Sequence, residues 1–192
     1  MKFRRVIGLF ALAVCLGFGL LHSQEAKAQQ FAVKTNALFW AMSTPDIGFE
    51  LVTGEHTSVA LSVSGHYKPY GINSKLALLQ PEFKYWFNGR PLTRTFVGVT
   101  AFAATYDIAV GNFAYDGEAF AAGVTGGYVF DLGKRWNLEL SGGFGLLVFN
   151  QKQLYKNDHY DDYFVDEAVK ANSWGYKLFP VRLGITFSYI IK

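Results

Sequence analysis

Two pairs of histidine and serine residues are spaced so that they could carry nucleophilic chemistry. His56 and Ser58 are two positions apart, as are Ser64 and His66, so each pair falls on one face of an extended strand. A histidine that accepts the proton of a serine hydroxyl can activate that serine for attack on an ester. The sequence supplies no pattern for an oxyanion hole, so we predict that the chain is not an enzyme.

An acidic segment near the C-terminus offers oxygen ligands for a metal ion. The candidate calcium ligands are Asp158, Asp161, Asp162, Asp166 and Glu167. Carboxylates of this kind bind Ca²⁺, but the segment lacks the fixed spacing and the glycine of an EF-hand loop. We therefore predict a solvated loop without a metal. The sequence contains no glycine-rich phosphate loop, and no cofactor is predicted.

The elements that position these residues are segments in which apolar and polar residues alternate. From Trp136 to Val148, every second residue is apolar or glycine, and alternation with period 2 is typical of strands with two different faces. Most such segments reach the roughly 9–11 residues of a tilted membrane strand. Eight strands are expected, at about 31–40, 46–53, 57–68, 76–87, 95–106, 118–130, 135–149 and 176–191. The sequence thus predicts an all-β, eight-stranded antiparallel up-and-down transmembrane barrel.

Six charged residues fall on the less apolar faces of these strands. They are Lys34, Glu50, Glu82, Lys84, Glu139 and Arg182. An eight-stranded barrel has an interior just wide enough for side chains to fill, and burying an unpaired ion costs on the order of several kcal/mol. Because three of the six are basic and three are acidic, we predict an ion-pair network in the lumen. A proton or ion path is the alternative.

The first 28 residues have the composition of a secretory signal peptide. A positively charged start precedes an uncharged apolar run, and Ala26 and Ala28 provide the small residues of a cleavage site. We expect cleavage after Ala28, which leaves residues 29–192 as one barrel domain. Cleavage removes four of the 18 basic residues, one of the 15 acidic residues and the only cysteine. The remaining chain is electrically balanced, so no disulfide and no binding to nucleic acid are expected.

The composition of the strand faces and the lengths of the connections distinguish a membrane barrel from a soluble one. The less apolar faces are mostly Ser, Gly, Thr and Ala, whereas a sheet face in water normally carries more charges. Longer connections at 69–75, 107–117 and 151–175 alternate with short turns, as in outer-membrane barrels. We predict an outer-membrane protein in contact with lipid. A soluble periplasmic carrier of a small apolar ligand is the alternative.

Aromatic residues cluster near both ends of the expected strands, as in the girdles at the two interfaces of a membrane barrel. The group expected at the outer side is Trp40, Tyr67, Tyr70, Tyr106, Phe149, Trp174 and Tyr176. The group expected at the periplasmic side is Trp86, Phe87, Phe96, Phe130, Trp136 and Tyr189.

Three segments carry a family resemblance over essentially the whole mature chain. Residues 34–38 read KTNAL, residues 79–87 read LQPEFKYWF, and residues 132–139 read LGKRWNLE. Together with the C-terminal strand, they resemble the Bacteroidota family labelled domain of unknown function 3575. The resemblance implies a small outer-membrane barrel, often encoded beside fimbrillin-type surface genes, with no established activity.

The expected role is structural or surface-interacting, with a possible link to fimbriae or the cell envelope. Residues 151–175 form the longest expected outer loop and contain interspersed tyrosines, which supply contact area at low entropic cost. They are the candidate contact for a surface or fimbrial protein. The enzymatic alternative is a lipid-modifying enzyme of the outer membrane that uses His66.

Overall fold

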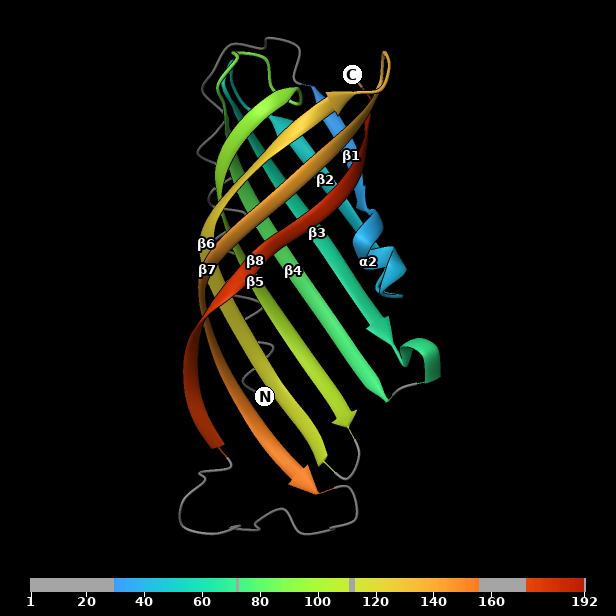
Figure 1. Ribbon diagram of the computed structural model, residues 1–192, viewed down its shortest axis with the longest axis vertical. Coiled ribbons are helices and arrows are strands. Elements are labelled where there is room, and N and C mark those ends of the chain that lie inside the picture. The colour runs from blue at the N-terminus through green and yellow to red at the C-terminus, as the bar shows by residue number, and fades with distance from the viewer. Residues whose placement is uncertain (1–29, 72, 111–112, 156–171, 192) are drawn as a thin grey trace.

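The computed structural model of the chain describes residues 30–71, 73–110, 113–155 and 172–191. These residues form one closed antiparallel barrel whose strands follow each other in chain order (Figure 1). The elements are β1 (Phe31–Asn36), α2 (Ala37–Ala41), β2 (Asp46–Val52), β3 (Thr57–Tyr67), the 3₁₀ turn η1 (Pro69–Gly71), β4 (Ser74–Trp86), β5 (Arg94–Val110), β6 (Phe113–Asp131), β7 (Trp136–Tyr155) and β8 (Asn172–Ile190). The predicted eight-stranded barrel is confirmed. The expected signal peptide at 1–28 lies outside the described residues.

The barrel closes where the first strand pairs with the last. Ala32 lies opposite Ile190 and Asn36 lies opposite Thr186. Each of the other strands pairs with its neighbours in sequence. Closure gives the paired strands main-chain hydrogen-bond partners on both sides, which is how barrels avoid an open sheet edge.

The two rims of the barrel differ in shape. Short turns at 53–56, 87–93 and 132–135 lie at the rim where β8 ends, which we call the C-terminal rim. At the opposite rim, strands β5–β8 extend well beyond β1–β3 (Figure 1).

The extension of these strands corrects two expected loops. β5 runs to Val110 and β6 begins at Phe113, so the long connection expected at 107–117 is wrong. β7 continues to Tyr155 and β8 begins at Asn172, so the loop expected at 151–175 is shorter than predicted.

The strand expected at 31–40 is also wrong, because a helix replaces its second half. β1 ends at Asn36, whose side-chain oxygen accepts a hydrogen bond from the N–H of Leu38 and caps α2. Asparagine is a preferred N-cap residue, and Ala37 and Leu38 are good helix formers, so local propensity overrides the weak alternation there. Among the described residues, no helix has both the length and the apolar composition needed to cross a membrane.

Alternate residues of each strand point into the barrel. On β7, Asn137 and Glu139 are buried, whereas Trp136, Leu140 and Phe144 are exposed. The alternation read from the sequence therefore assigns the inward and outward faces of β7 correctly.

The alternation on β8 changes its sense at a β-bulge. The register with β7 shifts between Gly143 and Gly145, which leaves an extra residue on β8 at Pro180–Val181. Proline has no N–H to donate to the ladder and is tolerated at bulges. Val181 is therefore buried next to the inward-pointing Arg182. The strand expected at 176–191 therefore does not keep one alternating face over its whole length.

Two apolar clusters fill the interior on either side of a polar layer. The cluster near the C-terminal rim contains Ala32, Trp86, Leu92, Phe96 and Val129. The cluster toward the opposite rim contains Phe102, Ala104, Ala121, Leu147 and Val181. Trp86 and Phe96 are fully buried, and Phe149 packs against the second cluster, so the girdle positions expected for these three residues are wrong.

Candidate functional site

The candidate site is a charged layer in the barrel interior, between the two apolar clusters. Its residues come from five strands: Lys34 (β1), Glu50 (β2), Glu82 and Lys84 (β4), Glu139 (β7) and Arg182 (β8). Each occupies an inward position, because alternate residues of a strand share one face. The structure brings together all six residues that the sequence predicts to pair.

Two lysines and two glutamates form the closest part of the layer. Nζ of Lys34 lies 2.5 Å from Oε2 of Glu50 and also pairs with Glu139. Nζ of Lys84 lies 2.8 Å from Oε2 of Glu139 and 3.4 Å from Oε2 of Glu50. Each lysine thus contacts both glutamates, and all four side chains are buried. The Lys84–Glu139 contact at 2.8 Å has the length of a strong charge-assisted hydrogen bond, whereas the Lys84–Glu50 contact at 3.4 Å is longer and weaker.

Glu82 and Arg182 form a looser part of the layer. Nη2 of Arg182 lies 3.8 Å from Oε2 of Glu82 and 3.8 Å from Oε1 of Glu139, which is beyond direct hydrogen-bond distance. The hydroxyl of Thr125 donates to Oε1 of Glu82 at 2.7 Å. Nη1 of Arg182 donates to Oε1 of Gln80 at 3.2 Å. Neighbouring polar groups therefore hold this ion pair in place.

Hydrogen bonds join the charged layer to the apolar cluster beside it. The hydroxyl of Ser58 donates to Oε1 of Glu50 at 2.6 Å, and Nε1 of Trp86 donates to Oγ of Ser58 at 2.8 Å. Nζ of Lys84 also lies 4.2 Å from the ring centroid of Phe96, within the range of a cation–π contact. The charges and the apolar residues thus form one packed unit.

The turn at 87–93 closes the interior at the C-terminal rim. Leu92 belongs to this turn, yet it is 2% exposed and packs in the cluster with Trp86 and Phe96. The backbone carbonyl of Leu92 accepts a hydrogen bond from Nδ2 of Asn137 at 2.7 Å. A turn residue thus seals the barrel beneath the charged layer.

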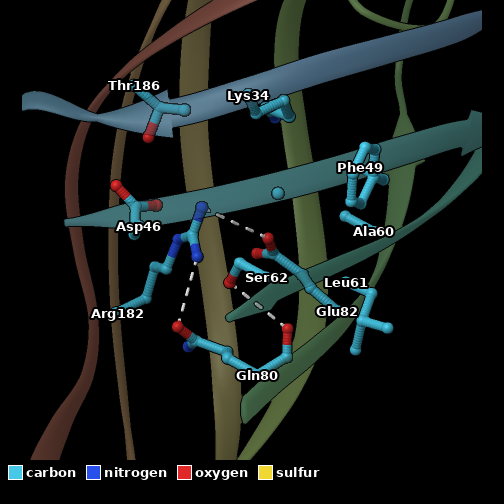
Figure 2. Close-up of a pocket in the computed structure, with 11 residues that line it drawn as sticks. Lys34, Asp46, Phe49, Ala60, Leu61, Ser62, Gln80, Glu82, Arg182 and Thr186 are labelled. Carbon is cyan, nitrogen blue, oxygen red and sulfur yellow. Dashed lines mark hydrogen bonds and ion pairs between the residues drawn. The ribbon is translucent and has the colours of Figure 1, made fainter. Parts of the chain in front are cut away.

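A small cavity lies beside the charged layer (Figure 2). Its volume is about 10 Å³, and its lining includes Lys34, Asp46, Glu82, Arg182 and Thr186. A cavity needs roughly 10–15 Å³ of volume open to the centre of a water-sized sphere to hold one water molecule. The cavity is therefore far too small for a nutrient-sized solute.

His66 is hydrogen-bonded on both ring nitrogens, but not to Ser64. Nδ1 lies 2.7 Å from Oγ1 of Thr44, and Nε2 lies 2.9 Å from Oγ of Ser74. Thr44 Oγ1 also lies 3.2 Å from the carbonyl oxygen of Met42, so Thr44 and Ser74 hold the imidazole of His66 from both sides. His66 therefore does not form the dyad of the enzymatic alternative with Ser64, whose hydroxyl has no hydrogen-bond partner.

His56 and Ser58 lie in different elements, because β3 begins at Thr57. Nδ1 of His56 donates to the carbonyl of Trp86 at 2.8 Å, and its ring stacks on Tyr85 at the C-terminal rim. Ser58 points inward and donates to Glu50. His56 belongs to the short turn at 53–56 and Ser58 to β3, so the two side chains do not form a catalytic pair.

The candidate calcium ligands Asp158, Asp161, Asp162, Asp166 and Glu167 lie outside the described residues. Within the part of the chain that the structure describes, no three His, Cys, Asp or Glu side chains are grouped so that they could hold a metal ion.

Several residues of the site were missed at the level of sequence. The missed residues are Ser58, Gln80 and Thr125. Each lies at an inward-facing, alternate position of its own strand, and this alternation is the sequence signal that identifies them. Leu92 carries no such signal, because it lies in a turn.

Comparison with known proteins places the whole described barrel in one family. The family described as "Protein of unknown function (DUF3575)" matches residues 12–191. No curated protein and no solved structure matches the chain.

Proposed function

Because the chain belongs to the DUF3575 family, whose description names no activity, we propose its function from the barrel itself. It is an outer-membrane barrel with a sealed lumen and a structural or surface-interaction role, and it is not an enzyme.

The observation that carries this proposal is the inverted distribution of apolar and charged side chains. Val124, Phe144 and Leu183 point outward and are 64%, 63% and 63% exposed, whereas Glu50 and Lys84 inside the barrel are 0% exposed. A barrel in water buries its large apolar side chains and exposes its charges. A barrel in a bilayer has an apolar outer band and a polar interior, so this surface fits contact with lipid.

The packed interior supports a structural role over that of a diffusion pore or a carrier. Apolar clusters lie on both sides of the charged layer, and Leu92 seals the C-terminal rim. An eight-stranded barrel filled by side chains has no open channel. A carrier of a small apolar ligand needs an apolar chamber, whereas the middle of this lumen is charged.

The opposite rim is the surface proposed to meet other molecules. Trp40, Tyr67 and Tyr70 are exposed there, and the hydroxyl of Tyr70 donates to the carbonyl of Ala41 at 2.8 Å, which fixes η1 against α2. The proposed contact for a surface or fimbrial protein remains at 151–175, of which 156–171 lie outside the described residues. The link to fimbriae rests on the family resemblance.

The membrane assignment is tested by fractionation and by electrophoresis with and without boiling. Membrane barrels resist detergent until heated, because their backbone hydrogen bonds are closed within the barrel. We expect the chain in the outer-membrane fraction, with a mobility that changes on heating. A soluble periplasmic band without this change would contradict the proposal.

The proposed contact is tested separately by replacing residues 156–171 with a short turn. β7 and β8 pair up to Lys152 opposite Asn172, so the heat-dependent mobility should persist while binding to the surface partner is lost. Retention of every surface interaction by the deletion variant would rule out this contact. A matched deletion within the turn at 132–135, at the other rim, should leave partner binding unchanged.

A further inference from the structure

The cavity beside Glu82 and Arg182 is bordered by buried polar atoms without a hydrogen-bond partner. Among the described residues, the buried side-chain atoms in this state are Ser64 Oγ, Glu82 Oε2, Ser141 Oγ, Arg182 Nε and Thr186 Oγ1. Glu82, Arg182 and Thr186 all line the cavity. Buried polar groups in native proteins are hydrogen-bonded in the great majority of cases. Three residues with unpaired atoms line the same cavity, which indicates that a molecule in the cavity is their common hydrogen-bond partner.

We infer that one ordered water molecule occupies this cavity and bridges Glu82, Arg182 and Thr186. The cavity volume of about 10 Å³ is close to the roughly 10–15 Å³ that one water needs. Buried waters typically make about three hydrogen bonds to otherwise unpaired groups, which is the number of unpaired atoms that the lining residues contribute.

The chemistry of the three atoms selects water over an ion. Nε of Arg182 is a donor, Oε2 of the Glu82 carboxylate is an acceptor, and the hydroxyl of Thr186 can act as either. A water molecule accepts from Arg182 and donates to Glu82 at the same time. A cation would be repelled by the guanidinium, and an anion would be repelled by the carboxylate.

The water also accounts for the loose geometry of the Glu82–Arg182 pair. The guanidinium Nη2 and the carboxylate Oε2 are 3.8 Å apart, and a bridging water supplies hydrogen bonds that are nearly as favourable as a direct one. In Figure 2, the guanidinium of Arg182 lies between Glu82 and Gln80, beside this cavity. This inference does not depend on the proposed membrane location, because it concerns only the barrel interior.

Crystallography of the refolded barrel tests the inference directly. The wild-type map should show one solvent peak within hydrogen-bond distance of Glu82 Oε2, Arg182 Nε and Thr186 Oγ1. The Thr186→Val variant, which removes one partner with little change of shape, should lose or weaken this peak. Ser64→Ala removes a hydroxyl that is also unpaired but does not line the cavity, so it should retain the peak.

Two further measurements make the inference falsifiable even if a variant does not fold. Crystals soaked in rubidium bromide should show no anomalous peak in the cavity, and such a peak would identify an ion site and overturn the inference. In solution, the Arg182 Nε proton of the wild-type barrel should show magnetisation transfer with a long-lived water. An empty cavity in the wild-type map, or no such transfer, would also overturn it.

Discussion

Lys84 donates hydrogen bonds to both carboxylate oxygens of Glu139, at 2.9 Å and 2.8 Å, across the interior from β4 to β7. Both side chains are buried, so loss of the lysine leaves a buried carboxylate without one of its counter-ions. Breaking a buried ion pair by removing one partner costs about 3–5 kcal/mol. We expect Lys84→Met to lower the free energy of unfolding by about this amount, measured by urea titration of the refolded barrel.

Lys75 is the matched control for this prediction. It pairs with Asp107 at 3.4 Å, but the two side chains are 54% and 49% exposed, and exposed pairs contribute about 0–1 kcal/mol. Lys75→Met should therefore change the free energy of unfolding by no more than about 1 kcal/mol. Equal losses for Lys75→Met and Lys84→Met would show that the charged layer does not stabilise the barrel.

The buried turn residue Leu92 yields a second prediction. Leu92→Ala removes apolar contacts with the cluster around Trp86 and should lower the free energy of unfolding by about 2–5 kcal/mol. Leu92 has a positive φ of 68°, but leucine and alanine are both disfavoured there, so the difference reports packing. Leu132→Ala changes an exposed leucine in another turn of the same rim and should stay within about 0.5 kcal/mol of wild type. A similar effect of both substitutions would mean that Leu92 does not seal the barrel.

Much of the barrel could be predicted because alternation reports which residues share a face. The same parity that puts Glu82 and Lys84 inside also puts Trp86 inside, so interpreting Trp86 as a girdle residue ignored information that was present. Alternation does not reveal where the inward face of a strand moves to the other set of residues, so the bulge at Pro180 was not predicted.

Other features depend on contacts that no local pattern encodes. Leu92 is buried because its turn folds into the barrel, and His66 meets Ser74 and Thr44 because two connections meet at the opposite rim. The contacts of Leu92 with Asn137 and of His66 with Thr44 join residues that are 45 and 22 positions apart. The charged layer could be predicted from the sequence only because its residues balance in charge and alternate with apolar residues.

Gly127 provides a third prediction, since it lies beneath the ring of Phe96. A Cβ at this position would lie 2.4 Å from the carbonyl oxygen of Leu140 and 2.8 Å from two ring atoms of Phe96. Because backbone must shift to relieve the first contact, Gly127→Ala should lower the free energy of unfolding by about 1–3 kcal/mol. The measurement is the urea midpoint and slope of the refolded protein.

Gly142 is the control for Gly127, because it also lies in a long strand of the barrel. A Cβ at Gly142 would have no heavy atom within 4 Å, so Gly142→Ala should leave the urea midpoint close to that of wild type. If the two alanine variants were equally stable, close packing over Gly127 would not be the reason for glycine at that position.

His66 yields the prediction that separates the proposed structural role from a lipid-modifying enzyme. The Ser74 hydroxyl that is hydrogen-bonded to His66 is on a buried residue, so lipid has no direct access to it and the pair holds two connections together. We expect His66→Ala and Ser74→Ala to leave the acyl-chain composition of outer-membrane lipid unchanged in a mass spectrum.

The same histidine variant should nevertheless be less stable. Loss of the imidazole leaves the buried Ser74 hydroxyl without its hydrogen-bond partner, which costs about 1–3 kcal/mol, whereas Thr44 keeps its hydrogen bond to the carbonyl of Met42. Ser64→Ala is the control, because its hydroxyl is buried on the same strand but makes no hydrogen bond, and it should be as stable as wild type. An altered acyl-chain profile in both His66→Ala and Ser74→Ala, but not in Ser64→Ala, would instead identify Ser74 as a nucleophile and overturn the non-enzymatic role.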